Sequence, residues 1–192
     1  MKYITLILIS FSCCFATIAQ EKLSDTSVKE FADKAIEKAK DLGTYIEIIS
    51  DKNTNNTDAM DAIDLAVKLF IDDEQSIAIS SLNREDVRTF QVRTYLQRLN
   101  LLKYSKVEVQ WYDVHYVSNL RKGTDGRYYG IVTVYQKFTG YSGDNIKYAD
   151  VTEKNIEIVL DRIPKNVGGT TVNVWEVYLG NITVAETTTL NE

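Results

Sequence analysis

The stretch that decides the fold is KVEVQWYDVHYVS, Lys106–Ser118, along which apolar and polar side chains alternate. Alternation with a period of two is typical of a β-strand that buries one face. A second stretch of this kind, YYGIVTVYQKF, spans Tyr128–Phe138, and Thr124-Asp125-Gly126 between the two has the composition of a hairpin turn. The sequence therefore predicts two long strands joined by a hairpin in the centre of the chain.

Two further long strands are expected after this pair. They span Lys147–Leu160, with an interruption near Thr152–Lys154, and Thr171–Ala185. Loops at Gly140–Asn145 and Pro164–Gly169 are expected to join consecutive strands. The second half of the chain is thus predicted to be a sheet of long, hairpin-linked strands.

The first third of the chain carries a helical pattern instead. Ser27, followed three residues later by Glu30, has the form of a capping box that begins a helix. One apolar stripe then runs along this helix through Val28, Phe31, Ala32, Ala35, Ile36, Ala39 and Leu42. We expect the helix to continue past Gly43, because the stripe stays in phase up to Ile49. The alternative is a stop at Gly43 and a short strand that begins at Tyr45.

Two more helices and a short strand are expected before the long strands. A second helix begins at Thr57 or Asp58, after a polar loop. Its apolar residues are Met60, Ile63, Ala66, Val67 and Phe70. Ser76–Ser80 is expected to be a short strand, and Arg84–Leu101 a third helix that carries Val87, Tyr95, Leu96 and Leu99 on its apolar positions.

The predicted order is helix, helix, short strand, helix and then four long strands. This order, with Tyr95-Leu96-Gln97-Arg98-Leu99 ahead of the long hairpins, resembles secreted bacterial members of the NTF2-like (SnoaL-like) superfamily. The resemblance implies an α+β cone, in which three N-terminal helices pack on a curved antiparallel sheet around a pocket. Some members are enzymes, such as ketosteroid isomerases and dehydratases, and many others only bind. The sequence contains no catalytic motif of any member that could be transferred.

The N-terminus has the form of a secretory signal peptide. Lys2 supplies a positive charge, Ile4–Ala16 is mostly apolar, and Thr17-Ile18-Ala19 matches the small-x-small pattern of a signal peptidase site. Cleavage after residue 19 would leave residues 20–192 as a single periplasmic or secreted domain. The alternatives are a membrane anchor, lipidation at Cys13 and a buried core helix. A short apolar run, a poor lipobox and the lack of a polar stripe disfavour them in turn.

The composition argues against several classes of function. Cys13 and Cys14 both lie in the predicted signal peptide, so the mature domain would have no disulfide and no thiolate metal site. His115, as the single histidine, leaves too few ligands for a zinc site, and no cofactor is expected. A formal net charge of -5 argues against binding to a nucleic-acid backbone. No membrane span would remain after cleavage.

Trp111, Asp113 and His115 are the candidate pocket residues. If the alternation along Lys106–Ser118 is unbroken, the three side chains share the helix-facing side of the sheet. Asp113 and His115 would then have Cβ atoms about 6.5–7 Å apart and could form a hydrogen-bonded dyad. Two alternatives stay open: the strand end emerges into solvent, or a bulge at Trp111–Tyr112 reverses the phase. We treat the three as ligand-pocket candidates, with no residue assigned as catalytic.

The opposite face of the predicted sheet is rich in tyrosine. Its members are Tyr112, Tyr116, Tyr129, Tyr135 and Tyr178. Tyrosine combines a flat apolar ring with a hydroxyl group and is enriched at interfaces. The alternative role is cross-strand pairing, which stabilises a sheet by about 0.2–1 kcal/mol per pair. These residues are candidates for an interface with a second copy of the chain or with an envelope protein.

The function that these observations favour is an exported, non-catalytic binding or assembly module that uses its sheet face or cone pocket. The alternative is a small-molecule enzyme of the isomerase or dehydratase kind, with Asp113 or His115 as its base. An enclosed pocket with a perturbed titratable group would favour the enzyme. An exposed aromatic patch would favour the module.

Overall fold

The computed structural model describes residues 23–116 and 118–190, which form three helices and seven strands. The predicted signal peptide and both cysteines lie outside the described residues. The helices are α1 (Asp25–Ser50), α2 (Asn56–Val67) and α3 (Val92–Asn100). The strands are β1 (Ser76–Ser81), β2 (Arg84–Gln91), β3 (Lys106–Tyr116), β4 (Arg121–Lys122), β5 (Tyr128–Ser142), β6 (Asn145–Val167) and β7 (Thr170–Thr188). This is the α+β class expected from the sequence.

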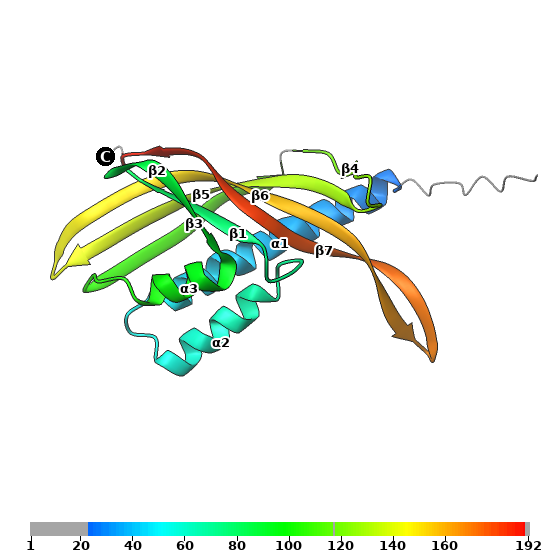
Figure 1. The fold of residues 1–192 in the computed structure, drawn as a ribbon, viewed down its shortest axis with the longest axis horizontal. Helices are drawn as coiled ribbons and strands as arrows, with labels where there is room; N and C mark the ends of the chain where they lie inside the picture. The colour runs from blue at the N-terminus through cyan, green and yellow to red at the C-terminus, as the bar shows by residue number, and fades with distance from the viewer. Residues whose placement is uncertain (1–22, 117, 191–192) are drawn as a thin grey trace, which may run out of the picture.

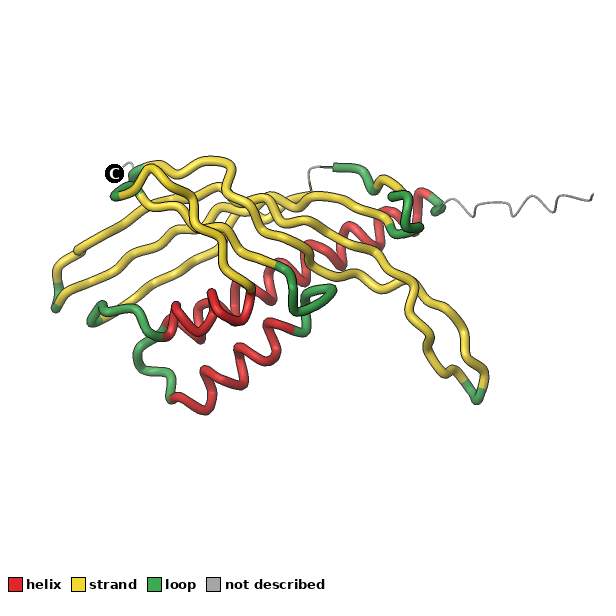
Figure 2. Tube along the Cα trace, in the orientation of Figure 1, coloured by secondary structure: helices red, strands yellow, loops and turns green. Residues whose placement is uncertain are grey.

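The strands form one sheet in the order β2-β1-β7-β6-β5-β3, and the short β4 pairs with β5. Neighbouring strands are antiparallel except β1 and β7, which run parallel where Ile77 meets Ile182. The sheet is therefore mixed, not wholly antiparallel as predicted. Its long strands curve over the helices, which lie on one side of it (Figure 1). The Cα trace shows the same two layers (Figure 2).

Helix α1 passes through Gly43 and continues to Ser50, so the predicted continuation is confirmed. The helix begins earlier than predicted, because the Ser24 side chain, not that of Ser27, caps it and accepts the Ser27 N–H at 3.2 Å. A Cβ atom at Gly43 would lie 3.0 Å from the Cβ of Trp111 on β3, so the glycine allows the helix to approach the sheet closely. In the part of the chain that is described, no helix is long and apolar enough to cross a membrane.

Residues 84–91 form strand β2, and the predicted helix over this segment is wrong. The strand pairs with β1 from Ser76 opposite Gln91 to Ser81 opposite Arg84, so the pairing with β1 satisfies its backbone. Most of its side chains are exposed, including Val87 at 54%. A mostly solvated strand has no buried face, and therefore its sequence carries no period that separates it from a helix. Helix α3 begins only at Val92.

The hairpins differ from the prediction at two places. The turn at residues 124–126 is present, but it joins β4 to β5 instead of joining β3 to β5. Strand β6 is unbroken and includes Pro164, which pairs with Asn173 of β7. Pairing between β5 and β6 ends at Leu160, so Pro164 lies in a two-stranded arm where its missing N–H is tolerated. The tight turn of this arm is Gly168-Gly169, both with positive φ.

The hydrophobic core lies between the helices and the concave face of the sheet. Helix α1 contributes its buried stripe, and α3 contributes Leu96, while alternate residues of β5 and β6 face them. Fully buried members from the four elements include Leu42, Ile46, Leu96, Val132, Val134, Ile156, Ile158 and Leu160. Toward Asn145, the helix-facing side of β6 changes from apolar to polar. That change marks the position of the candidate site.

Candidate functional site

The alternation of β3 breaks at Asp113. This residue has φ of 51°, the one non-glycine residue with positive φ among those described, and the pairing with β5 shifts between Tyr112 and His115. Tyr112 lies opposite Tyr135 and His115 opposite Thr133, which share one face of β5. The bulge therefore turns His115 onto the face opposite the one predicted. A bulge that reverses the phase is therefore present, but it lies at Asp113 and not at Trp111–Tyr112 as the alternative had it.

Asp113 and His115 consequently point into solvent, and the expected inward orientation is wrong. Their side chains are 67% and 47% exposed, respectively. The His115 Nδ1 atom lies 2.9 Å from the Asp113 main-chain oxygen and 3.8 Å from its Oδ1 atom. Neither residue lines the cavity described below. An exposed pair of this kind lacks the desolvation that tunes a general base.

Trp111 does face the helix layer, where it packs against α1 at Gly43. Its indole N–H donates a hydrogen bond to the Oε1 atom of Gln136 at 3.2 Å. Gln136 is buried and lines the cavity, whereas Trp111 contacts Gln136 but does not line the cavity itself. Trp111 therefore supports the wall of a pocket instead of forming its surface.

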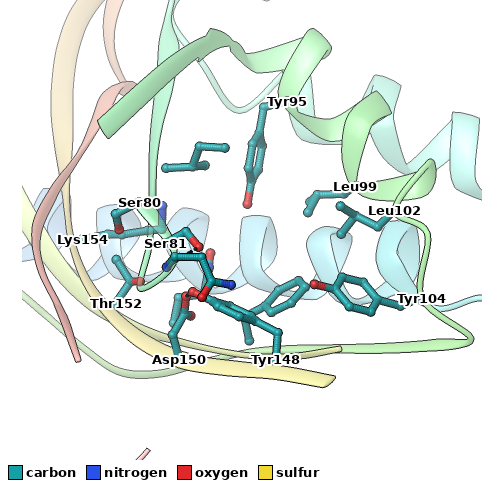
Figure 3. A pocket seen from close by; sticks show the side chains of 14 residues that line it. Ser80, Ser81, Tyr95, Leu99, Leu102, Tyr104, Tyr148, Asp150, Thr152 and Lys154 are labelled. Atoms are coloured by element: carbon teal, nitrogen blue, oxygen red, sulfur yellow. Dashed lines mark hydrogen bonds between the residues drawn. The ribbon is translucent and has the colours of Figure 1, made fainter. Parts of the chain in front are cut away.

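A cavity of about 220 Å³ lies between α3, β1 and the helix-facing side of the sheet (Figure 3). Apolar side chains from three elements (β1, α3 and β5) and from the loop before β3 form much of its wall: Ile79, Leu99, Leu102, Tyr104 and Phe138. Polar side chains of β1 and β6 form the floor. This combination of an apolar wall and a few converging polar groups is typical of a small-molecule site.

Lys154 is the largest fully buried side chain of the described structure, with 1% of its surface exposed. Its Nζ atom donates a hydrogen bond to the main-chain oxygen of Ala78 on β1 at 2.8 Å. Burial lowers the pKa of Lys154 to about 8, and the charge of Asp150 acts in the opposite direction. At neutral pH this lysine is mainly an ammonium group with two N–H donors left over.

Asp150 lies on the same face of β6 and is 4% exposed. The Tyr148 hydroxyl donates to its Oδ2 atom and itself accepts the Leu82 N–H at 3.0 Å. The Oδ1 atom is buried and has no hydrogen-bond partner within the described residues. Burial raises the pKa of Asp150 above its ordinary value. A buried acceptor without a donor is costly, so this atom is a natural contact for a ligand.

Tyr95 projects from α3 toward this floor, and its hydroxyl points into the cavity (Figure 3). The side chain is 5% exposed, yet no described residue forms a hydrogen bond with its hydroxyl. Burial, with a further contribution from the charge of Asp150, raises the pKa of Tyr95. Tyr95 therefore stays a neutral hydrogen-bond donor at physiological pH.

Asp150 and Lys154 are not among the candidates predicted from the sequence, although the sequence does contain a signal for them. The alternating set Tyr148, Asp150, Thr152 and Lys154 continues the face of β6 that Ile156, Ile158 and Leu160 occupy. The interruption expected near Thr152–Lys154 is absent, because these residues continue β6 without a break. Polar residues that keep the phase of a buried face instead indicate a polar cavity floor.

The tyrosine face is partly paired within the sheet. Tyr112 is 44% exposed and stacks on Tyr135, with ring centroids 5.8 Å apart. Tyr129 lies opposite Val159, which lies opposite Tyr178, so these three form a second row. The Tyr129 hydroxyl donates to Asp125, and the Lys38 ammonium lies 5.6 Å from the ring centroid of Tyr178. The side chain of Tyr116 lies outside the described residues.

No protein-family model and no curated protein matches this chain. Two solved structures resemble it over most of their length. One is a candidate scytalone dehydratase from Novosphingobium aromaticivorans, with a TM-score of 0.44 and 10% identity over 87% of this chain and 93% of the other. The second is a protein of Kribbella flavida, with a TM-score of 0.42 and 11% identity over 83% and 95% of the two chains. At these values neither structure bears on the activity of this chain.

Proposed function

We propose that this protein is an exported NTF2-like domain that binds a small molecule in the cavity beneath α3. The observation that carries the proposal is the set of buried polar groups that line a cavity with an apolar wall: Lys154, Asp150 and Tyr95. Buried polar groups in folded proteins have partners, and a bound ligand would provide the ones that are lacking here. The NTF2-like assignment rests on the order of helices and strands. Export rests on the N-terminal sequence pattern alone.

Catalysis is the second candidate, and one observation favours it. Asp150 and Lys154 both face the cavity with pKa values moved toward the physiological range, upward for the carboxyl group and downward for the amine. Groups tuned in this way can exchange protons with a bound molecule. An isomerase or dehydratase of this chain would therefore use Asp150 and Lys154 in place of Asp113 and His115.

A bulky residue in the lining of the cavity should weaken ligand binding strongly. Leu102 is half-buried and lines the cavity, whereas its neighbour Leu101 is 75% exposed and does not. We expect Leu102→Trp to weaken binding of small cyclic fragments at least about tenfold, because the indole fills the space, and Leu101→Trp to leave binding unchanged. Saturation-transfer NMR with a fragment mixture measures this. Equal binding by both variants would place the ligand site elsewhere.

The tyrosine face remains a proposed contact with a second copy of the chain or with an envelope protein. The exposed stack of Tyr112 on Tyr135 supports this proposal. We expect the wild type to self-associate in sedimentation velocity, and a Tyr112→Ser, Tyr135→Ser double variant to associate at least about tenfold more weakly. Leu65→Ser, at an exposed position on α2, is the control and should have no effect. A monomeric wild type would contradict the homodimer.

A further inference from the structure

We infer that the free edge of β3 is a docking site for an extended segment of a partner protein that carries Lys or Arg at alternate positions. The segment adds to the sheet as a further strand, and its basic side chains face Glu47 and Asp51 at the end of α1. The residues that line this site are not shared with the cavity beneath α3, so the inference is independent of the proposed ligand.

Strand β3 lies at one end of the sheet and pairs on one side only, with β5 (Figure 1). The pairing is regular from Lys106 to Tyr112, ahead of the bulge at Asp113. In an antiparallel pair, alternate residues direct their main-chain N–H and C=O groups away from the partner strand. Within the described structure, residues 106–110 form no main-chain hydrogen bond other than those with β5. This edge therefore offers a row of unused donors and acceptors, with which an added strand can pair.

The opposite edge of the sheet shows how such pairing is discouraged. Strand β2 forms that edge, and half of its residues are charged, on both faces of the strand. In β3 the helix-facing positions hold Val107 and Val109 instead. The charged residues Lys106 and Glu108 occupy the other face and pair with each other at 2.6 Å. The helix-facing side of the β3 edge is thus without the charges that protect β2.

A groove of about 410 Å³ runs along this edge. The strand contributes five consecutive residues to it, from Lys106 to Gln110, so the groove follows the main chain and not one face of the sheet. The opposite wall is the C-terminal end of α1, with Asn53 and Thr54 of the loop that follows. At about 3.3 Å per residue the groove is about 17 Å long, which is the length of an extended pentapeptide.

The groove is acidic. Its lining holds three carboxylates, those of Glu47, Asp51 and Glu108, against the single ammonium group of Lys106. Glu108 is paired with Lys106, whereas Glu47 and Asp51 have no cation within 4.0 Å in the described structure. Helix α1 has no basic residue in its last turn, so the negative end of its dipole is also uncompensated. The Lys52 ammonium donates to a main-chain oxygen of α3 and does not line the groove. The α1 wall therefore attracts a cationic partner.

The two unpaired carboxylates set the spacing of the cationic groups. Glu47 and Asp51 are four residues apart at the end of α1, which separates them by about 6 Å along the helix axis. Side chains at positions i and i+2 of a strand share a face and lie about 6.6 Å apart. Basic side chains at alternate positions of the added strand therefore meet one carboxylate each. Ile48, which is 36% exposed and also lines the groove, offers apolar area to their methylene stems.

Two peptides of the same composition test the spacing on the wild-type protein by NMR titration. The lysines alternate in Thr-Lys-Val-Lys-Val-Thr and are adjacent in Thr-Lys-Lys-Val-Val-Thr, and both peptides have blocked termini. Adjacent lysines point to opposite faces of a strand, so the second peptide can place only one of them on the α1 wall. We expect the first peptide to bind at least about fivefold more tightly. Equal affinities, or no binding of the first peptide at millimolar concentration, would overturn the inference.

Hydrogen exchange tests the strand pairing itself. We expect the alternating peptide to slow amide exchange at every second residue of 106–110, because an added strand bonds to alternate N–H groups. Binding without this protection would mean that charge alone holds the peptide, and strand addition would be wrong. Protection of the same amides that grows with protein concentration in the absence of peptide would identify a second copy of the chain as the occupant. That result would also overturn the inference.

A charge reversal tests the acidic wall. Glu47→Lys should weaken binding of the alternating peptide at least about tenfold and remove its advantage over the other peptide. Glu37→Lys is the matched control, because Glu37 is an exposed residue of the same helix that does not line the groove. The control has the same net charge as Glu47→Lys and should bind both peptides as the wild type does. Equal loss of binding in the two variants would show a nonspecific attraction and would contradict a site at the β3 edge.

Discussion

Replacing Ile46 by alanine is expected to lower the free energy of unfolding by about 2–5 kcal/mol, whereas Ile48→Ala should lower it by less than about 1 kcal/mol. Ile46 is fully buried on the inner side of α1, and Ile48 is 36% exposed. Urea denaturation of both variants and the wild type measures the difference.

This pair distinguishes the two local structures that the sequence allows after Gly43. In a helix, residues 46 and 48 point in different directions, but in a strand they would share a face. Equal destabilisation by the two substitutions would therefore contradict the continuation of α1 to Ser50.

The second large effect is a dependence of stability on pH that comes from Lys154. Burial lowers its pKa from 10.5 to about 8 in the folded protein. Between these values the unfolded chain binds more protons than the folded one, so stability rises with pH. Below pH 8 the destabilisation from burying the ammonium group is fully present, and above pH 10.5 it has disappeared.

We therefore expect the stability of the wild type, relative to Lys154→Met, to increase by about 3 kcal/mol from pH 7 to pH 10.5. The difference between the two proteins cancels the titration of the exposed lysines and tyrosines. Denaturation at a series of pH values measures it. A difference that does not change with pH would mean that Lys154 is solvated rather than buried.

The elements with one buried face are those that the sequence predicts well. Helix α1 keeps a continuous apolar stripe through Gly43, and β3 and β5 alternate clearly over most of their length. The spacing of apolar residues reflects which side chains are buried, so it predicts an element correctly when only one face of that element is buried. Strand β2 is exposed on nearly all its residues and gives no such signal.

The errors around the site have a different cause. The inward position of His115 depended on unbroken alternation, and a single bulge at Asp113 reverses the phase of every residue that follows it in β3. The sequence predicts an interruption near Thr152–Lys154, but β6 is unbroken there and carries both Asp150 and Lys154 on its helix-facing side. The phase shared with Ile156, Ile158 and Leu160 marks the helix-facing side of β6, but the cavity above it depends on how α3 and β1 pack there, which local sequence does not encode.

The candidate functional groups thus lie on the cavity floor formed by β6, and not at the exposed end of β3. The residues concerned are held by several elements at once, since β1 provides the partner of Lys154 and α3 provides Tyr95. A site assembled in this way would be rigid before the ligand arrives, which limits the entropic cost of binding.

The central claim is that the cavity beneath α3 holds the ligand, and intermolecular nuclear Overhauser effects test it most directly. With a small cyclic fragment bound in the cavity, we expect contacts from the fragment protons to the methyl groups of Leu99 and Leu102. Contacts to Tyr112 and Tyr135 on the opposite face of the sheet, without any to Leu99 or Leu102, would contradict it.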